Sequence, residues 1–326
     1  MEGSAGEQRI LDLANFAGTR ALLTAVELDL FTELSDGPGS ADDLSKRTGA
    51  DPTGLHSLLL ALRALGLVRL EGEVFRSTAD ADRYLSRRSP HCVAEYLHAE
   101  ADAWEDWGRL AAVVRSGRPL HRTTLYREAS ARAERLVLGD HAIARSVAPA
   151  LAARLDLSGC DRLLDLGGGA GTYAIEFCRR NPDLRCTLLD LPAALRVAER
   201  IVLETEVADR IDLVGGDFLV QDLGGPYDVV FASGVLCGQD VGENRNLLAR
   251  SHRALRSGGR ILLRDHFLDP VEPRPPAAAF LPLRLLLLTG RGRPYGEQEA
   301  MGWLVETGFQ GARVLESNAL LEAVRP

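Results

Sequence analysis

RLLDLGGGAG, residues 162–171, places a short apolar strand directly before a loop that contains four glycines. Residues 172–181 then have the composition of a helix, which Pro182 ends. Glycine allows both a tight turn and the close approach of a ligand to the backbone. A strand, a glycine loop and a helix in this order are typical of the ligand-binding turn of an α/β domain.

Strand and helix patterns alternate through the rest of the C-terminal half. Strands are predicted at 186–190, 211–214, 228–232 and 260–264, helices at 193–207 and 243–256, and a closing pair of strands at 312–316 and 319–324. This alternation predicts a doubly wound, mostly parallel sheet in an α/β domain.

The N-terminal half is predicted to be helical with one small hairpin. Helices are predicted at 10–34, 41–47, 52–65, 92–116 and 129–155, and a β-hairpin at 67–76. Helix, turn, helix and hairpin together make a winged-helix unit. This raises the alternative of a DNA-binding regulator.

The charges argue against that alternative. The chain has 38 basic and 46 acidic residues, a net charge of −8, which makes it a poor general partner for nucleic acid or an anionic membrane. Residues 40–88 contain eight basic and seven acidic residues, and the helix at 52–65 has one arginine and one histidine among many leucines. A recognition helix needs several polar or basic side chains to reach bases and phosphates.

An acidic residue follows the glycine loop at the spacing expected for a ribose-binding carboxylate. Asp190 ends the next strand, 25 residues beyond Asp165, where a carboxylate can accept hydrogen bonds from two ribose hydroxyls. The dinucleotide fingerprint fails, because its sixth position, counted from Gly167, is Thr172. The phosphate-loop Gly-Lys-Ser/Thr is absent as well. We therefore predict a ribose-bearing ligand without a pyrophosphate.

Three further motifs complete a recognisable pattern. The glycine loop is followed by Asp190-Leu191-Pro192, Gly216-Asp217-Phe218 and Ser257-Gly258-Gly259-Arg260. Together with the winged unit, Trp107 ahead of Arg115-Ser116-Gly117, and the tail from Tyr295 to Phe309, the chain resembles the S-adenosylmethionine-dependent small-molecule O-methyltransferases. These include plant phenolic and hydroxyindole enzymes and bacterial enzymes that tailor secondary metabolites. The resemblance covers nearly the whole chain.

The resemblance implies a methyltransferase-type Rossmann fold with a helical N-terminal winged-helix dimerisation domain. It implies a dimerisation domain at 1–90, a helical linker and substrate-pocket region at 91–158, and a Rossmann domain that binds S-adenosylmethionine at 159–326. It also implies an intertwined homodimer and S-adenosylhomocysteine as product. The cofactor-binding residues would be Asp165, Gly167, Gly168, Gly169, Gly171, Asp190, Leu191, Gly216, Asp217, Phe218 and Ser233. Gly167, Gly169 and Gly171 would lie along the methionine part, Asp190 at the ribose, and Asp217 and Phe218 at the adenine.

The catalytic motif departs from the family pattern. The family places a histidine after a Val-Leu pair as general base, with two acidic partners. Here Cys237 stands at that place, Asp265 retains one acidic partner, and Pro294 lies near the other. A cysteine is a poor base unless its thiolate is stabilised. His266, next to Asp265 at the end of a strand, is the candidate for a relocated base, and a packed or solvated histidine is the competing interpretation.

Three reactions remain open from the sequence. The first, which we rank first because every matched cofactor residue is intact, is O-methylation of an aromatic or polyketide-like metabolite. It would proceed by proximity alone or with a relocated base. The second is C- or N-methylation on the same scaffold. The third is a non-methylating step, such as hydroxylation, decarboxylation or a pericyclic reaction.

The acceptor pocket is predicted from apolar and aromatic residues, which suit a flat small-molecule acceptor. The predicted substrate-binding residues are Asn15, Phe16, Trp104, Trp107, Tyr126, Phe280 and Arg284, with Asn15 and Phe16 supplied by the partner subunit's N-terminal helix. Arg284 interrupts an apolar run, which predicts a charged partner. A substrate carboxylate is our hypothesis for that partner, and a salt bridge to a neighbouring acidic residue, or simple exposure of Arg284, is the competing explanation.

Metals, membranes and secretion are not expected. The five cysteines include no Cys-x-x-Cys pair, so neither a disulfide framework nor a zinc site is predicted. His91, Glu95 and His98 could share a helix face, yet a solvated face is the favoured interpretation. No apolar run approaches the roughly 18 residues of a membrane helix, and no secretory signal is visible at the N-terminus. We expect a cytoplasmic protein.

Overall fold

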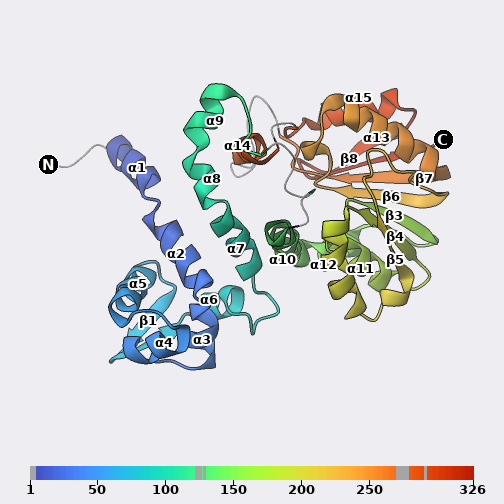
Figure 1. Cartoon of the computed structure of the whole chain (residues 1–326). Coiled ribbons are helices and arrows are strands. Elements are labelled where there is room, and N and C mark those ends of the chain that lie inside the picture. The colour runs from blue at the N-terminus through green and yellow to red at the C-terminus, as the bar shows by residue number, and fades with distance from the viewer. Residues whose placement is uncertain (1–4, 122–126, 128–129, 269–278, 290–291) are drawn as a thin grey trace. The chain divides into compact units, whose positions relative to one another are not determined.

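The computed structural model describes residues 5–121, 127, 130–268, 279–289 and 292–326. By their internal contacts these residues form two compact units, Met1–Trp104 and Glu105–Pro326. In Figure 1 the first unit is blue to teal, and the second runs from green to red. None of the helices in the described part of the chain is long and apolar enough to cross a membrane.

The first unit consists of helices and one hairpin. Its elements are α1 (Ala5–Ala14), α2 (Ala17–Glu27), α3 (Leu30–Asp36), α4 (Ala41–Thr48), α5 (Pro52–Ala64), β1 (Val68–Glu71), β2 (Val74–Ser77), α6 (Ala79–Leu85) and α7 (Ala94–Asp102). Ser40 and Asp43 form a capping box at the start of α4, which ends at Gly49 with φ 71°. Asp51 caps α5, whose first residue is a proline. These signals lie in the sequence, so both helices match their predicted ranges within one residue.

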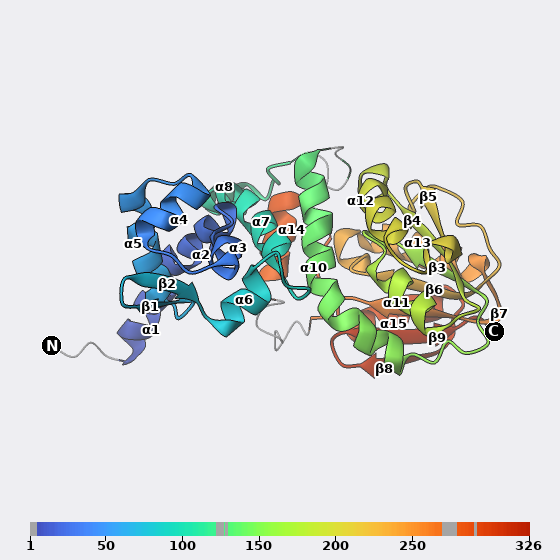
Figure 2. The ribbon, with the colours of Figure 1, turned by 90° about the horizontal axis from the view of Figure 1, so that it is seen from below.

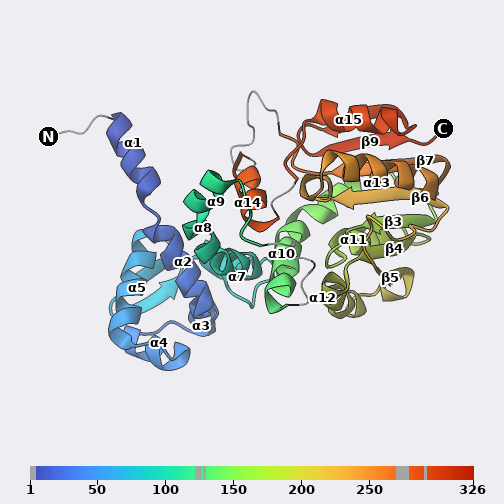
Figure 3. The same cartoon turned by 45° about the horizontal axis from the view of Figure 1, so that its top comes forward.

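Two predicted long helices are wrong. The range 10–34 contains three segments, α1, α2 and α3, which Figure 3 shows one after another in blue. Between α2 and α3, Asp29 has a left-handed backbone with φ 52°, and its Oδ1 accepts a hydrogen bond from the Thr32 hydroxyl at 2.7 Å. The range 92–116 likewise divides into α7, α8 (Trp104–Gly108) and α9 (Leu110–Ser116). Apolar periodicity continues across such breaks and therefore does not mark them.

The helix α5 packs its apolar face into the core of the first unit. Leu55, Leu59 and Leu62, spaced four and three residues apart, are at most 1% exposed and pack with Phe31 and Phe75. The helix contains one arginine. It therefore lacks the row of cations with which a recognition helix contacts DNA phosphates.

The second unit is a seven-stranded sheet in the order β5-β4-β3-β6-β7-β9-β8. The first five strands are parallel, and β9 alone is reversed, so that it pairs antiparallel with both β7 and β8. The strands are β3 (Arg162–Leu166), β4 (Arg185–Asp190), β5 (Ile211–Gly215), β6 (Tyr227–Ser233), β7 (Leu255–Arg264), β8 (Gln310–Glu316) and β9 (Leu320–Val324). The chain order reverses between β3 and β6, and ligands bind at such a switch point, beyond the carboxyl ends of the strands. The predicted doubly wound, mostly parallel sheet is confirmed.

Helices cover both faces of this sheet (Figure 1). The helices on the sheet are α10 (Ala131–Arg154), α11 (Thr172–Arg180), α12 (Pro192–Leu203), α13 (Val241–Ala254) and α15 (Glu297–Glu306). The helix α14 (Leu281–Leu288) lies against α9 instead. Leu163, Phe231 and Leu262 pack with α10, α11 and α12, while their neighbours along each strand pack with α13 and α15. Figure 2 shows the long helix α10 in green beside α11. The helix predicted at 193–207 ends earlier, at Leu203.

Candidate active site

The glycine loop after β3 is shaped by close contacts that only glycine allows. Gly167 and Gly169 have φ of 65° and 57°. A Cβ on Gly168 would lie 2.7 Å from Cγ of Leu188 and 2.8 Å from Oδ2 of Asp165. The loop therefore presents bare backbone at the carboxyl end of β3, where a ligand can approach it closely.

Asp190, at the end of β4, is hydrogen-bonded to this loop. Its Oδ2 accepts a hydrogen bond from the Gly169 N–H at 2.7 Å, and its Oδ1 accepts one from the Leu191 N–H at 2.6 Å. The Gly216 N–H donates to the Asp190 backbone carbonyl at 2.9 Å. Burial raises the pKa of Asp190 to about 6, against the opposing effect of the two amides. The ends of β3, β4 and β5 thus meet around one residue, Asp190.

Asp165 is a buried carboxyl group beneath the loop. It is 1% exposed, and within the described part of the chain neither oxygen accepts a hydrogen bond of ordinary geometry. Burial, with the nearby Asp190, raises its pKa to about 7, although the Ala174 backbone N–H acts in the opposite direction. Orphaned buried oxygens, a bare backbone cradle and a second carboxylate fit a ribose-bearing, cationic cofactor. They do not fit a pyrophosphate.

The predicted adenine residues lie after β5. Asp217 Oδ1 accepts a hydrogen bond from the Leu219 N–H at 3.0 Å, and its Oδ2 is paired with Nη2 of Arg127 at 2.7 Å. The Phe218 ring lies beside the glycine loop, since a Cβ on Gly167 would be 3.4 Å from its Cε1. The structure therefore brings Asp217 and Phe218 to the same edge of the sheet as Asp190.

The three predicted catalytic residues also come together, between β6 and the end of β7. The backbone N–H groups of Cys237 and His266 donate to the Asp265 carboxylate at 3.2 and 2.8 Å. The Cys237 thiol donates to the Gly234 carbonyl at 3.5 Å. Cys237 and Asp265 are buried, whereas His266 is exposed.

Electrostatics keep the Cys237 thiol protonated. Its pKa is raised well above the ordinary value, first by burial and then by the Asp265 charge. Burial also raises the pKa of Asp265, against the effect of the His266 and Cys237 N–H groups. The backbone N–H of Cys237 acts in the opposite direction without reversing the shift, so Cys237 has the properties of a neutral side chain at pH 7.

The segment from Gly292 to Tyr295 packs against the backbone of Cys237 and the residues that follow it. A Cβ on Gly292 would lie 2.2 Å from the Cys237 carbonyl oxygen, which requires glycine there. The Tyr295 hydroxyl donates to the Gln239 carbonyl at 2.6 Å. Pro294, which directly precedes Tyr295, is buried. The segment around Pro294, where the resemblance would place the second acidic partner, is therefore packed against the chain after β6.

Two family models match the chain, an O-methyltransferase domain over residues 107–310 and an O-methyltransferase dimerisation domain over residues 11–87. The chain belongs to the O-methyltransferase family. It is an enzyme, a methyltransferase that depends on S-adenosylmethionine, as the sequence resemblance implies. The dimerisation domain supports a homodimer.

Relatives of this O-methyltransferase include two from Streptomyces. The tetracenomycin polyketide synthesis 8-O-methyl transferase of S. glaucescens is 36% identical over 306 residues, covering 91% of this chain and 89% of the relative. The 3-hydroxy-5-methyl-1-naphthoate 3-O-methyltransferase of S. sahachiroi is 32% identical over 303 residues, covering 91% and 87%. The human N-acetylserotonin methyltransferase structure, in complex with S-adenosylmethionine, has a TM-score of 0.89 at 24% identity over 99% of both chains, which shows the fold.

Sequence reasoning missed several residues of the O-methyltransferase that surround the loop. Arg264, the last residue of β7, has its Nη1 3.3 Å from the Ser233 hydroxyl and its Cζ 5.5 Å from the centre of the Tyr173 ring. His141 Nδ1 lies 2.8 Å from the Thr172 hydroxyl, and burial lowers the pKa of His141 to about 4. No spacing in the sequence links these pairs, because each joins separate elements.

The O-methyltransferase has a further buried cluster that the sequence did not indicate. Asp106 on α8 is paired with Arg132 on α10 and with Nε2 of His121 at 3.3 Å. Asp106 is 7% exposed. The cluster holds the first turn of α10 against α8 and the segment that follows α9.

The residues predicted for the acceptor pocket lie in both units. In the first unit, Asn15 and Phe16 are exposed between α1 and α2, and the Phe16 ring lies 6.1 Å from the Trp104 ring. In the second unit, Trp107 is partly exposed on α8. Their roles toward an acceptor stay predictions.

Two other predicted pocket residues are near α14. Phe280 precedes the helix and is 62% exposed, and Arg284 on the helix is partly exposed and has a polar or charged interaction. Tyr126 lies outside the described residues.

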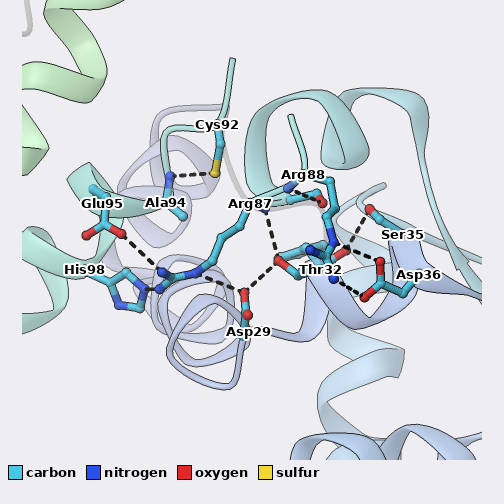
Figure 4. Close-up of polar contacts among 12 residues, drawn as sticks. Asp29, Thr32, Ser35, Asp36, Arg87, Arg88, Cys92, Ala94, Glu95 and His98 are labelled. Carbon is cyan, nitrogen blue, oxygen red and sulfur yellow. Dashed lines mark hydrogen bonds and ion pairs between the residues drawn. The ribbon is translucent and has the colours of Figure 1, made fainter. Parts of the chain in front are cut away.

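The histidines considered as metal ligands have another role (Figure 4). His98 Nε2 lies 3.0 Å from Nη2 of Arg87, whose guanidinium also pairs with Glu95 at 3.4 Å and with Asp29 at 3.3 Å. His91 precedes α7 and does not share its face. The described residues contain no cluster suited to a metal ion. The guanidinium links the α2–α3 junction to α7 instead.

Proposed function

We propose that this O-methyltransferase methylates a phenolic hydroxyl of an aromatic, polyketide-type small molecule. The observation that carries the proposal is the position of the exposed His266 and the buried Asp265, at the same sheet edge as the glycine loop and Asp190. Two relatives are named for O-methylation of a polyketide and of a hydroxynaphthoate, which supports this class of acceptor.

The residues around the loop would hold S-adenosylmethionine. The glycine backbone would lie along its methionine part, Asp190 would accept hydrogen bonds from the ribose, and Asp217 and Phe218 would contact the adenine. Buried Asp165 supplies negative charge near the cationic centre. When bound, S-adenosylmethionine supplies a methyl group already activated on its sulfonium. The chain's own task is alignment and the exclusion of water.

The proton of the acceptor hydroxyl needs a recipient other than Cys237. That thiol is buried and protonated, and the segment around Gly292 packs against the Cys237 backbone. His266, by contrast, is exposed, and its backbone N–H donates to Asp265. We assign it the role of general base, which contributes typically 10²–10⁴-fold.

The working enzyme would be an intertwined homodimer in the cytoplasm. The dimerisation domain supports the dimer, and the partner's Phe16 would complete the acceptor pocket. All five cysteines are free thiols, which agrees with a reducing compartment.

Titration calorimetry of the full chain with S-adenosylmethionine and S-adenosylhomocysteine tests the cofactor site. We expect micromolar binding that Asp190→Ala abolishes. A panel of phenolic polyketides is then incubated with the cofactor, and the product should gain about 14 Da, the mass of one methylene. Loss of that gain when the phenol is already methylated would locate the reaction at oxygen. A product of unchanged mass, or one heavier by an oxygen atom, would replace the methylation proposal with a non-methylating reaction.

A further inference from the structure

Arg264 places a guanidinium at the strand ends around the glycine loop. It is the last residue of β7 and is paired in register with Ser233, the last residue of β6. The strand β6 in turn neighbours β3, which leads into the loop. Arg264 has the same side-chain direction as Leu262, toward α11, and it stacks over Tyr173, the second residue of that helix. Its charge therefore lies on the face of the sheet that also holds Asp165.

The charge of Arg264 has no counter-ion in the described part of the chain. Of the five N–H donors of a guanidinium, one has a hydrogen bond, to the Ser233 hydroxyl at 3.3 Å, and the Tyr173 ring lies beneath the group. Other arginines of β7 differ. Arg260 pairs with Glu322 at 2.9 Å, and Arg256 pairs with Asp228. A partly buried cation with unused donors is costly unless a ligand supplies the anion.

The cofactor carries one group that the other site residues do not suit. The residues assigned to it so far are the glycines, three aspartates, Leu191, Phe218 and Ser233, and none of them carries a positive charge. Aspartates suit ribose hydroxyls and cationic centres, and they repel the α-carboxylate of the methionine part. We propose that Arg264 binds this α-carboxylate and thereby positions the methionine part of the cofactor. This inference depends on the placement of the cofactor given under the proposed function.

An acceptor molecule with a carboxylate would present the same chemistry to Arg264. The arginine's place beside Tyr173, in the first turn of the helix that follows the glycine loop, favours the cofactor as the source. An experiment can separate these two sources. If Arg264 binds the cofactor carboxylate, replacing the arginine changes cofactor affinity without any acceptor present. If it binds an acceptor carboxylate, cofactor affinity stays the same.

The test is titration calorimetry of the full-length wild type and Arg264→Gln with two ligands. One is S-adenosylhomocysteine, and the other is S-adenosyl-3-thiopropylamine, which lacks only the carboxylate. We expect Arg264→Gln to weaken S-adenosylhomocysteine binding about 10- to 100-fold, as for a charge-assisted contact, and the thiopropylamine by less than about twofold. Arg264→Lys, which keeps the positive charge, should retain part of the preference for S-adenosylhomocysteine over the thiopropylamine. Arg185→Gln, an equal charge change at the opposite end of the sheet, should leave both affinities unchanged.

Three outcomes would overturn the proposal. Equal weakening of both ligands by Arg264→Gln would mean that Arg264 only supports the shape of the site. If Arg264→Gln left S-adenosylhomocysteine affinity unchanged but weakened the binding of an acidic acceptor more than that of its methyl ester, the arginine would be assigned to the acceptor. Failure of the wild type to bind either ligand would reject the cofactor placement before any variant is compared. Thermal melting checks each variant's fold, and Arg264→Lys carries the comparison if Arg264→Gln is unfolded.

Discussion

At the scale of single residues, the site depends on carboxyl groups whose protonation changes near neutral pH. The pKa of Asp165 is raised to about 7 and that of Asp190 to about 6, mainly by burial. Both groups are therefore largely protonated at pH 5 and ionised at pH 8. A cationic cofactor with ribose hydroxyls binds better to the ionised forms.

We predict that affinity for S-adenosylmethionine rises about tenfold or more between pH 5 and pH 8. The sign follows from the raised pKa values, because lowering the pH neutralises both carboxylates and removes their attraction for the cation. Titration calorimetry at constant ionic strength measures the effect. In Asp165→Asn the part of the rise above about pH 6 should disappear. A flat profile in the wild type would contradict the assignment of these carboxylates to the cofactor.

A second prediction separates Cys237 from His266. Cys237→Ala should change kcat/KM by less than about threefold, because a buried neutral thiol takes no proton. His266→Gln should lower kcat by about 10²-fold at pH 7. It should leave S-adenosylhomocysteine affinity unchanged. If His266→Gln retains full activity and Cys237→Ala does not, the roles given to these two residues are reversed.

At the scale of elements, the glycine loop and its neighbouring strands act as one rigid support. Gly168 is the tightest point for a side chain, because a Cβ at this residue would lie within 3 Å of both Leu188 and the Asp165 carboxylate. We predict that Gly168→Ala destabilises the enzyme by about 1–3 kcal/mol and weakens cofactor binding at least about tenfold. Urea unfolding and calorimetry measure the two effects.

The matched control is Gly302→Ala on α15, where an added methyl meets no atom within 4 Å. It should be neutral or slightly stabilising, because alanine favours helix more than glycine does. If the two variants behave alike, the contacts at Gly168 do not shape the cofactor site.

Elements with local signals could be predicted, and junctions without them could not. Ser40, Asp51 and the glycine loop determine backbone hydrogen bonds or φ angles within a few residues of themselves, so the sequence locates them closely. The breaks at Asp29 and after Asp102 interrupt a continuing apolar pattern. At the start of α3 the Asp29 carboxylate accepts from the Thr32 hydroxyl and also pairs with Arg87 from a distant segment. The sequence cannot reveal such a pairing.

The same distinction holds for the site. The glycine loop and Asp190 follow from motif spacing, and the structure joins them through the Gly169 N–H. Arg264 had no motif, because its position depends on the register between β7 and β6 and on the direction of its side chain. The packing around Cys237 could not be predicted from the sequence either, because Gly292, which packs against its backbone, lies far along the chain.

At the scale of the whole molecule, the N-terminal helices present apolar side chains to solvent. Ile10, Leu13 and Phe16 are 65%, 83% and 68% exposed. Three large apolar side chains within seven residues are unfavourable on an isolated subunit and are typical of an interface. The dimerisation domain that matches residues 11–87 includes Leu13 and Phe16. We infer that a second copy of the chain covers them.

We predict that Leu13→Glu with Phe16→Glu converts the dimer to a monomer, measured by light scattering after gel filtration. A charge placed in an apolar interface loses its hydration without gaining a partner, which opposes association. Leu203→Glu on α12, at a site 69% exposed, is the control and should stay dimeric. Because the partner's Phe16 is assigned to the acceptor pocket, the monomer should lose acceptor turnover. Its S-adenosylhomocysteine affinity should stay within about twofold, because every proposed cofactor contact belongs to one subunit. Full turnover by a proven monomer would remove the partner from the pocket and leave the dimer a purely structural role.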